Sequence, residues 1–188
     1  VVKATRTLIN TLKDAENADI WIKKHCKLNI PVVITMEATG NYYEIFAFFL
    51  HRKGYYVSVV LPNKAKKYME SRGLKTKNDP VDARGLAQMG AEQRLDQWEP
   101  LSESIYQLRL LTRHYEGLVV QKTQINNQMT SQQSGMYISS KVIKHMRQLI
   151  ELIEKQKKET LKLAEQIVNE DPYLNERFAK ILNIKGIG

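Results

Sequence analysis

The stretch PVVITMEATGNYYEIF, residues 31–46, has the pattern of a strand, a turn and the start of a helix. Its first part, residues 32–36, is almost wholly apolar and rich in β-branched side chains, which favours a buried strand. Glu37 follows this run, and Gly40 permits a turn before an apolar helical pattern begins near Asn41. We therefore predict a strand that ends in a carboxylate and is followed at once by a helix.

The segments around this stretch predict a second strand parallel to the first. Residues 55–62, YYVSVVLP, form a short apolar run that ends at Pro62. A helix is predicted between the two strands, and another is predicted before them, from a cap at Asn10 to about Lys27. Apolar and polar side chains roughly alternate over residues 1–9, which suggests a further strand that is cut off at its start. Because strand–helix–strand units pair in parallel, we expect an α/β fold with a helix-covered sheet.

Composition excludes several classes of protein. The chain has 188 residues, of which 43% are hydrophobic and 26% charged, a balance typical of globular domains. No apolar run approaches the roughly 20 residues that span a bilayer. The single cysteine, Cys26, excludes an internal disulfide framework and favours a reducing compartment.

The formal net charge of +9 favours a polyanionic partner, because basic side chains that neutralise phosphates release counterions. The excess is concentrated between residues 51 and 84, where only Glu70, Asp79 and Asp82 oppose it. Arg52 and Lys53 also belong to this stretch, and we predict that nucleic acid contacts its other basic residues, namely Lys64, Lys66, Lys67, Arg72, Lys75, Lys77 and Arg84.

Two aspartates lie inside this basic stretch. A helix is predicted from Asp79 or Pro80 to Ala91, and side chains three apart on a helix, such as Asp79 and Asp82, lie about 5–6 Å from each other at Cβ. Together with Glu37 they would form an oxygen-rich site suited to one or two Mg²⁺ or Mn²⁺ ions. The alternative is structural: Asp79 as a helix cap, Asp82 as a first-turn acid, and Glu37 as a cap for the next helix.

The second half of the chain has a different character. Apolar residues at helical spacing predict one long helix from Ser102 and another over residues 139–169, separated by a polar segment containing Gly135. Two such helices fold back on each other as a hairpin or coiled coil, or pair with another chain. Pro172 is expected to end the second helix.

Three linked motifs resemble those of one family. They are the tetrapeptide EATG at residues 37–40, LPN at residues 61–63 and KNDPVDA at residues 77–83, and the tail LNIKGIG is similar to the opening of the family's C-terminal region. The chain is identified on these motifs as a member of the DEDD transposases of insertion sequences, in the IS-one-ten group that includes pilin-inverting recombinases.

This resemblance implies an RNase H-like domain of the RuvC type, in which four acids bind divalent metal. Glu37, Asp79 and Asp82 match the second, third and fourth acids. The first acid belongs to an N-terminal strand that this chain lacks, and neither Asp14 nor Asp19 has its context. The family also uses a serine in its C-terminal region, beyond the matched positions. We therefore expect an N-terminally incomplete domain, and a chain that is inactive in strand transfer by itself.

The implied organisation is a partial RuvC-like domain at residues 1–98, a helical hairpin or coiled coil at 99–172, and the start of the C-terminal region at 173–188. The expected function is part of a transposase or site-specific DNA recombinase that uses Mg²⁺ or Mn²⁺ and can be guided by a structured RNA.

The resemblance also implies partners and a location. We expect a dimer or tetramer assembled through the hairpin, in the bacterial cytoplasm near the nucleoid. Nucleic-acid contacts on the hairpin are expected at Arg109, Arg113, Lys122 and Lys144, although a solvated helix face explains these residues equally well. The alternative function is a non-catalytic nucleic-acid-binding and oligomerisation module. A junction-resolving nuclease would share the fold class.

Overall fold

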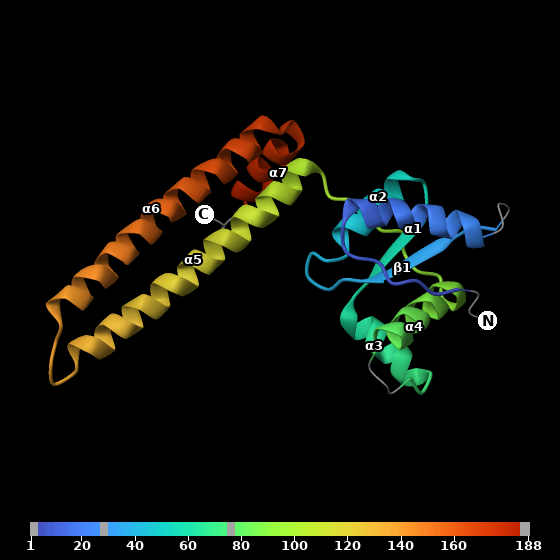
Figure 1. The fold of residues 1–188 in the computed structure, drawn as a ribbon. Coiled ribbons are helices and arrows are strands. Elements are labelled where there is room, and N and C mark those ends of the chain that lie inside the picture. Colours follow the sequence, from blue (N-terminus) through green and yellow to red (C-terminus); the bar gives the residue numbers. More distant parts are fainter. Residues whose placement is uncertain (1–3, 27–29, 75–77, 185–188) are drawn as a thin grey trace. The chain divides into compact units, whose positions relative to one another are not determined.

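A computed structural model describes residues 4–26, 30–74 and 78–184. The chain divides into two compact units, Val1–Pro100 and Leu101–Gly188 (Figure 1).

The first unit is built around a parallel pair of strands. β1 (Val33–Glu37) pairs with β2 (Tyr56–Val60) in a register that runs from Val33 opposite Tyr56 to Glu37 opposite Val60. The crossover between them contains α2 (Glu44–Arg52), as the strand–helix–strand pattern predicted. Within the described residues the sheet has two strands, and the arrangement is of the α/β class.

Helices cover both faces of this sheet (Figure 1). One face packs against α2 and the preceding helix α1 (Leu12–His25), with Val57, Ala47 and Leu50 in its core. Trp98 packs against this core, and its backbone N–H donates to the carbonyl oxygen of Val57 at 2.7 Å.

The opposite face packs against α3 (Pro62–Ser71) and α4 (Asp79–Glu92). Val60 from β2 joins Ala65 and Met69 from α3 and Met89 from α4 in one apolar core. Because side chains alternate along a strand, Val33, Thr35 and Glu37 all belong to this α4-covered face.

The beginning of the chain differs from the sequence prediction. Residues 4–9 form no strand, and the backbone N–H of Ile9 instead donates to Asp14 Oδ2 at 2.6 Å. The cap of α1 is Thr11 rather than Asn10, because the Thr11 hydroxyl accepts from the backbone N–H of Asp14 at 3.2 Å. The helix ends at His25, and the predicted end at Lys27 lies outside the described residues.

Helix α3 was not predicted. Pro62, interpreted from sequence as the end of a strand, occupies the first turn of this helix, where its missing N–H has no cost. The next helix, α4, also begins differently. Its cap is Asn78, whose side-chain oxygen accepts from the backbone N–H of Val81 at 3.0 Å, so the prediction of Asp79 as the cap is wrong.

The second unit contains two long helices and a short one. α5 (Glu103–Gln133) and α6 (Ser140–Glu170) lie side by side and run in opposite directions, and α7 (Pro172–Leu182) follows (Figure 1). Ser102 and Ser139 cap the two long helices. Leu118 of α5 and Ile143 and Ile153 of α6 are buried. Each long helix therefore has an apolar side, as its spacing predicted.

An ionic cluster joins α5 to α6. Glu154 Oε1 lies 2.7 Å from Lys122 Nζ and 3.3 Å from Lys157 Nζ, and the Lys157 ammonium lies 5.4 Å from the centre of the Tyr115 ring. Lys122 first, and Lys157 next, lower the pKa of Glu154 by hydrogen bonding to it. Lys122 thus serves to hold the two helices together, which a sequence pattern alone does not reveal.

Candidate functional site

Glu37 is the last residue of β1 and is half-buried. Its Oε1 atom accepts a hydrogen bond from the Thr39 hydroxyl at 2.9 Å. The structural alternative for Glu37 was a cap on the following helix, but α2 begins after Tyr43 and has no side-chain cap. Glu37 therefore lies at the carboxyl end of a parallel strand, which is where ligands bind in open α/β sheets.

Asp79 and Asp82 both lie in the first turn of α4. Asp79 is exposed and Asp82 is half-buried. Because Asn78 supplies the side-chain cap, the Asp79 carboxylate is not needed for that role. A carboxylate in the first turn of a helix is stabilised by the helix dipole, so both residues also fit their local structure.

The three carboxylates are not gathered into one cluster. Within the part of the chain that the structure describes, no group of three or more His, Cys, Asp or Glu side chains is close enough to hold a metal ion. The close approach of α4 to Thr35 of β1 is at Gly90, towards the other end of α4 from the two aspartates. At 1.5 Å per residue, Asp82 and Asp79 lie about 12 and 16 Å along the helix from Gly90.

The donor set nevertheless has the chemistry of a site for a hard cation. Carboxylate oxygens are the ligands that Mg²⁺ and Mn²⁺ prefer, and two of them project from one helical turn. Asp79 and Asp82 are thus a pair of candidate cation ligands on one helical turn. Glu37, the third candidate, lies on the strand that α4 covers.

A fourth acid near the sheet, Asp19, serves a different purpose. It is buried in α1, where it accepts hydrogen bonds from Lys23 at 2.8 Å and from the Tyr55 hydroxyl at 2.7 Å, and these bonds lower its pKa. Tyr55 immediately precedes β2, at the opposite end of the sheet from Glu37. Asp19 is consequently not a partner of Glu37, as its sequence context indicated.

The basic residues predicted to contact nucleic acid differ in their surroundings. Lys75 and Lys77 lie outside the described residues. Lys66 forms a surface pair with Glu70 at 3.8 Å, one turn along the same helix. The remaining cations of this group that project into solvent are Lys64, Lys67 and Arg84.

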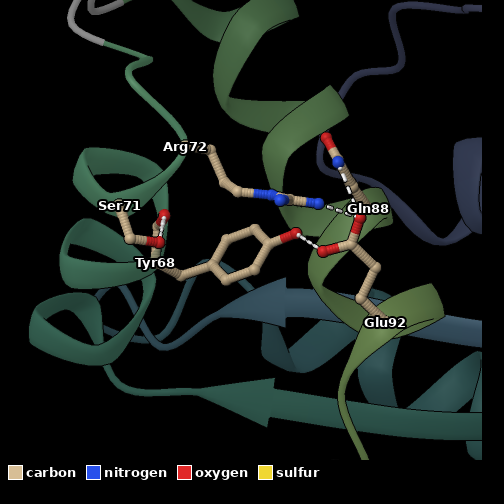
Figure 2. Close-up of polar contacts among 5 residues, drawn as sticks. All are labelled: Tyr68, Ser71, Arg72, Gln88 and Glu92. Atoms are coloured by element: carbon tan, nitrogen blue, oxygen red, sulfur yellow. Dashed lines mark hydrogen bonds and ion pairs between the residues drawn. The ribbon is translucent and has the colours of Figure 1, made fainter.

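Arg72 is engaged within the protein (Figure 2). It follows α3 and forms an ion pair with Glu92, the last residue of α4. Its guanidinium carbon also lies 5.9 Å from the centre of the Tyr68 ring. A role in joining α3 to α4 therefore accounts for Arg72 without nucleic acid.

In the second unit, Arg109 is half-buried and its guanidinium carbon lies 4.5 Å from the centre of the Tyr106 ring. Arg113 and Lys144 are exposed. Sequence reasoning missed a longer basic row on α6. Six exposed cations recur at helical spacing within about 120° of arc, away from the side that carries Ile143 and Ile153; they are Lys141, Lys144, Arg147, Lys155, Lys158 and Lys162. Two acids interrupt them, because Glu151 lies in the same arc and Glu159 pairs with Lys155 at 3.9 Å. Placing the basic residues of the predicted helix on a helical wheel, rather than summing charge over sequence segments, would have revealed this row.

Among the described residues, no helix combines the length and apolarity needed to cross a membrane.

Comparison with known proteins identifies the class. The sequence model of the DEDD transposases of the IS-one-ten group, described as a transposase, matches residues 2–138. The chain belongs to this family, which confirms the resemblance found in the motifs around Glu37, Asp79 and Asp82.

Two curated relatives make the relationship more specific. They are the pilin gene-inverting protein of Moraxella bovis and that of Moraxella lacunata, each 29% identical to this chain over 186 residues. The alignments cover 97% of this chain and 55% of each relative. The chain thus spans about half the length of the curated relatives it matches.

Proposed function

We propose that this chain is the part of a transposase or site-specific recombinase that holds DNA phosphodiesters near a divalent cation. The observation that carries the proposal is the position of Glu37 at the carboxyl end of β1, on the face covered by the helix whose first turn contains Asp79 and Asp82. Family membership supports the same assignment. The corresponding fold is a RuvC-type RNase H-like domain, followed by a helical hairpin or coiled coil.

The carboxylates and the lysines have separate tasks in this proposal. Glu37, Asp79 and Asp82 would hold Mg²⁺ or Mn²⁺ if α4 and the end of β1 were brought together, and the cation would then supply positive charge to the phosphodiester. Lys64 and Lys67, exposed on α3, neutralise phosphates of the same strand. No residue of this chain matches the family's first acid or its serine, so we expect binding without strand transfer.

The second unit contributes a further nucleic-acid surface and an assembly surface. The row of six cations on α6 runs from Lys141 to Lys162, a length of about 32 Å at 1.5 Å per residue. Such a row can follow the phosphates of DNA or of a structured guide RNA. Apolar side chains beside it, including Leu149 and Leu152, are about half exposed, which favours a homo-oligomer paired through these helices.

The α6 row also favours the second candidate function, a non-catalytic nucleic-acid-binding and oligomerisation module. Replacement of both Asp79 and Asp82 by alanine distinguishes the two functions. A cation site predicts that the double variant loses Mn²⁺ binding in a calorimetric titration, whereas a pure binding module predicts no loss of Mn²⁺ binding and unchanged or tighter DNA binding. Asp96→Asn, which removes an exposed acid from the connector after α4, is the matched control.

A further inference from the structure

The turn that joins α5 to α6 carries three consecutive hydrophobic side chains, Met136, Tyr137 and Ile138, and Figure 1 shows this turn at the end of the hairpin opposite α7. These side chains are 91%, 88% and 58% exposed, and the first two values are the highest among the large hydrophobic side chains of the described residues. A run of three exposed apolar residues is unfavourable on a protein surface unless it serves a function. Residues 136–138, called the tip below, therefore form a candidate contact surface.

The backbone is held on both sides of the tip. On the α5 side, the backbone N–H of Gly135 donates to the carbonyl oxygen of Gln132 at 3.3 Å. On the α6 side, Ser139 caps the helix, and Ile143 in its first turn is buried. The tip is therefore the end of a paired, packed arm, and its side chains can enter a partner without unfolding of either helix.

The charge of the hairpin next to the tip has one sign. The sequence contains no acidic residue between Glu116 and Glu151, and the first turns of α6 carry three exposed cations, Lys141, Lys144 and Arg147. From the start of α6 to Glu151 is about 16 Å of helix, and α5 also lacks acids over the corresponding length. Charge complementarity therefore favours a polyanion as the partner of the tip.

The α5 side of the same region is rich in uncharged hydrogen-bonding groups. Exposed side-chain amides occupy its last turns, at Gln124, Asn127, Gln128, Gln132 and Gln133. An amide both donates and accepts, so it can bond to a phosphate oxygen or to the edge of a base. A second copy of the chain, in contrast, would bring the same positive charge to a contact between two tips. The surroundings of the tip thus suit nucleic acid better than another tip.

We propose that the tip inserts between neighbouring base pairs of duplex DNA and opens the step between them, while Lys141, Lys144 and Arg147 neutralise the flanking phosphates. Apolar side chains such as methionine and isoleucine act as wedges of this kind in proteins that kink DNA, and an aromatic ring stacks on a base that the wedge exposes. The inference rests on the proposed function in taking DNA as the polyanion. It goes beyond the contact of the α6 row with phosphates, because that contact leaves the bases stacked.

The experiment separates base insertion from phosphate contact. Binding of the whole chain is measured to two duplexes of the same length, one fully matched and one with a central two-base mismatch, whose bases are already poorly stacked. The matched duplex carries 2-aminopurine at a central TA step, because the fluorescence of this base rises when it is unstacked. We expect the wild-type chain to bind the mismatched duplex about tenfold more tightly, since insertion there has less stacking to disrupt, and to raise the fluorescence of the matched one.

A triple variant of the tip, Met136→Gln, Tyr137→Gln and Ile138→Gln, removes the wedge and keeps the cations. This variant should bind the two duplexes equally, should leave the fluorescence of the matched duplex unchanged, and should keep the salt dependence of the wild type. The matched control replaces three exposed hydrophobic side chains along the helices, with Leu110→Gln, Val120→Gln and Leu163→Gln, and should behave as the wild type does in both measurements. Tyr137→Phe, which keeps the aromatic ring, should retain both properties as well.

Failure of the inference and failure of the proposed function give different results. If the wild type binds both duplexes equally, or if the tip variant keeps the mismatch preference and the fluorescence rise, insertion is wrong although DNA binding stands. If the wild type binds neither duplex, both are wrong. A tip variant with unchanged DNA measurements but a lower molar mass in light scattering would assign the tip to a second copy of the chain. Loss of binding to vesicles of anionic phospholipid, again with unchanged DNA measurements, would assign it to a membrane surface. Either result overturns the inference.

Discussion

Thr35 of β1 and Gly90 of α4 lie so close together that a methyl group on Gly90 would overlap the Thr35 Oγ1 atom. This contact sets the distance between the helix and the strand that ends in Glu37. The Thr35 hydroxyl is buried there, and it has no hydrogen-bond partner among the described residues. Ser58, which is the register neighbour of Thr35 on β2, is equally enclosed. Close packing, rather than hydrogen bonding, therefore holds α4 on the sheet.

Gly90→Ala should destabilise the first unit. Alanine normally stabilises a helix relative to glycine by about 0.5–1 kcal/mol, but here the added methyl must displace Thr35, and overpacking costs about 1–3 kcal/mol. Chemical denaturation followed by circular dichroism measures the net loss. Gly117→Ala on α5, where a methyl meets nothing within 4 Å, is the control and should be neutral or stabilising.

Removal of the Thr35 hydroxyl should relieve this clash. The remaining Thr35 Cβ lies 3.4 Å from the position that the methyl would occupy, a tight but tolerable contact. The double variant Thr35→Ala and Gly90→Ala is therefore expected to be more stable than Gly90→Ala alone. Simple additivity of the two single changes would show that the contact does not control the packing of α4.

The pairing of α5 with α6 should depend on its buried side chains. Ile153 is 6% exposed, so Ile153→Ala is expected to cost about 2–4 kcal/mol of unfolding free energy. Val120 of α5 is 55% exposed, and Val120→Ala should change the stability by less than about 1 kcal/mol. Equal losses in the two variants would contradict the observed pairing of the helices. Thermal or urea unfolding of the chain measures both values.

Alkaline pH should weaken the attachment of α1 to the sheet. Burial first, and the hydrogen bond to Asp19 next, raise the pKa of Tyr55 from 10.0 to about 12. A raised pKa stabilises the fold below the unfolded value, and this contribution is lost as the pH rises from about 10 towards 12. Over that range the unfolding free energy of the wild type should fall more steeply than that of Tyr55→Phe. Parallel pH profiles would show that Tyr55 is not held in its neutral form.

The basic row on α6 should contribute to the salt dependence of nucleic-acid binding. Each phosphate contact adds about 0.9 to the slope of log K against log salt for duplex DNA. Replacing Lys144, Arg147 and Lys158 by glutamine should therefore reduce the slope by about 2–3. The control removes the same charge from exposed residues of the first unit, at Lys13, Lys24 and Arg52. An equal reduction in both triple variants would mean that net charge, rather than the row, determines binding.

The elements with strong periodicity were predictable from sequence. The apolar runs at β1 and β2 and the helical spacing of α5 and α6 each satisfy one dominant pattern. Helix α3 was missed because its buried residues, Ala65, Tyr68 and Met69, are interleaved with lysines that obscure the apolar spacing. The cap of α4 was misassigned by one residue because Asn78 and Asp79 are adjacent and are both good capping residues.

The candidate site was only partly predictable. Helical spacing places Asp79 beside Asp82, but the distance from either to Glu37 depends on where α4 crosses β1, which is set by the Gly90 contact. Likewise, the sequence shows Arg72 as one cation among many, because its partner Glu92 is twenty residues away. Long-range contacts of this kind leave no local pattern.

The most direct test of the proposed cation site is a double-mutant cycle on Mn²⁺ affinity. It compares the wild type with Glu37→Gln, with Asp82→Asn and with the double variant. If the two carboxylates share one cation, each single variant should weaken binding, and the double variant should be scarcely weaker than the worse single one. Independent, additive effects, or a Glu37→Gln protein that binds Mn²⁺ as the wild type does, would contradict a site formed by β1 and α4.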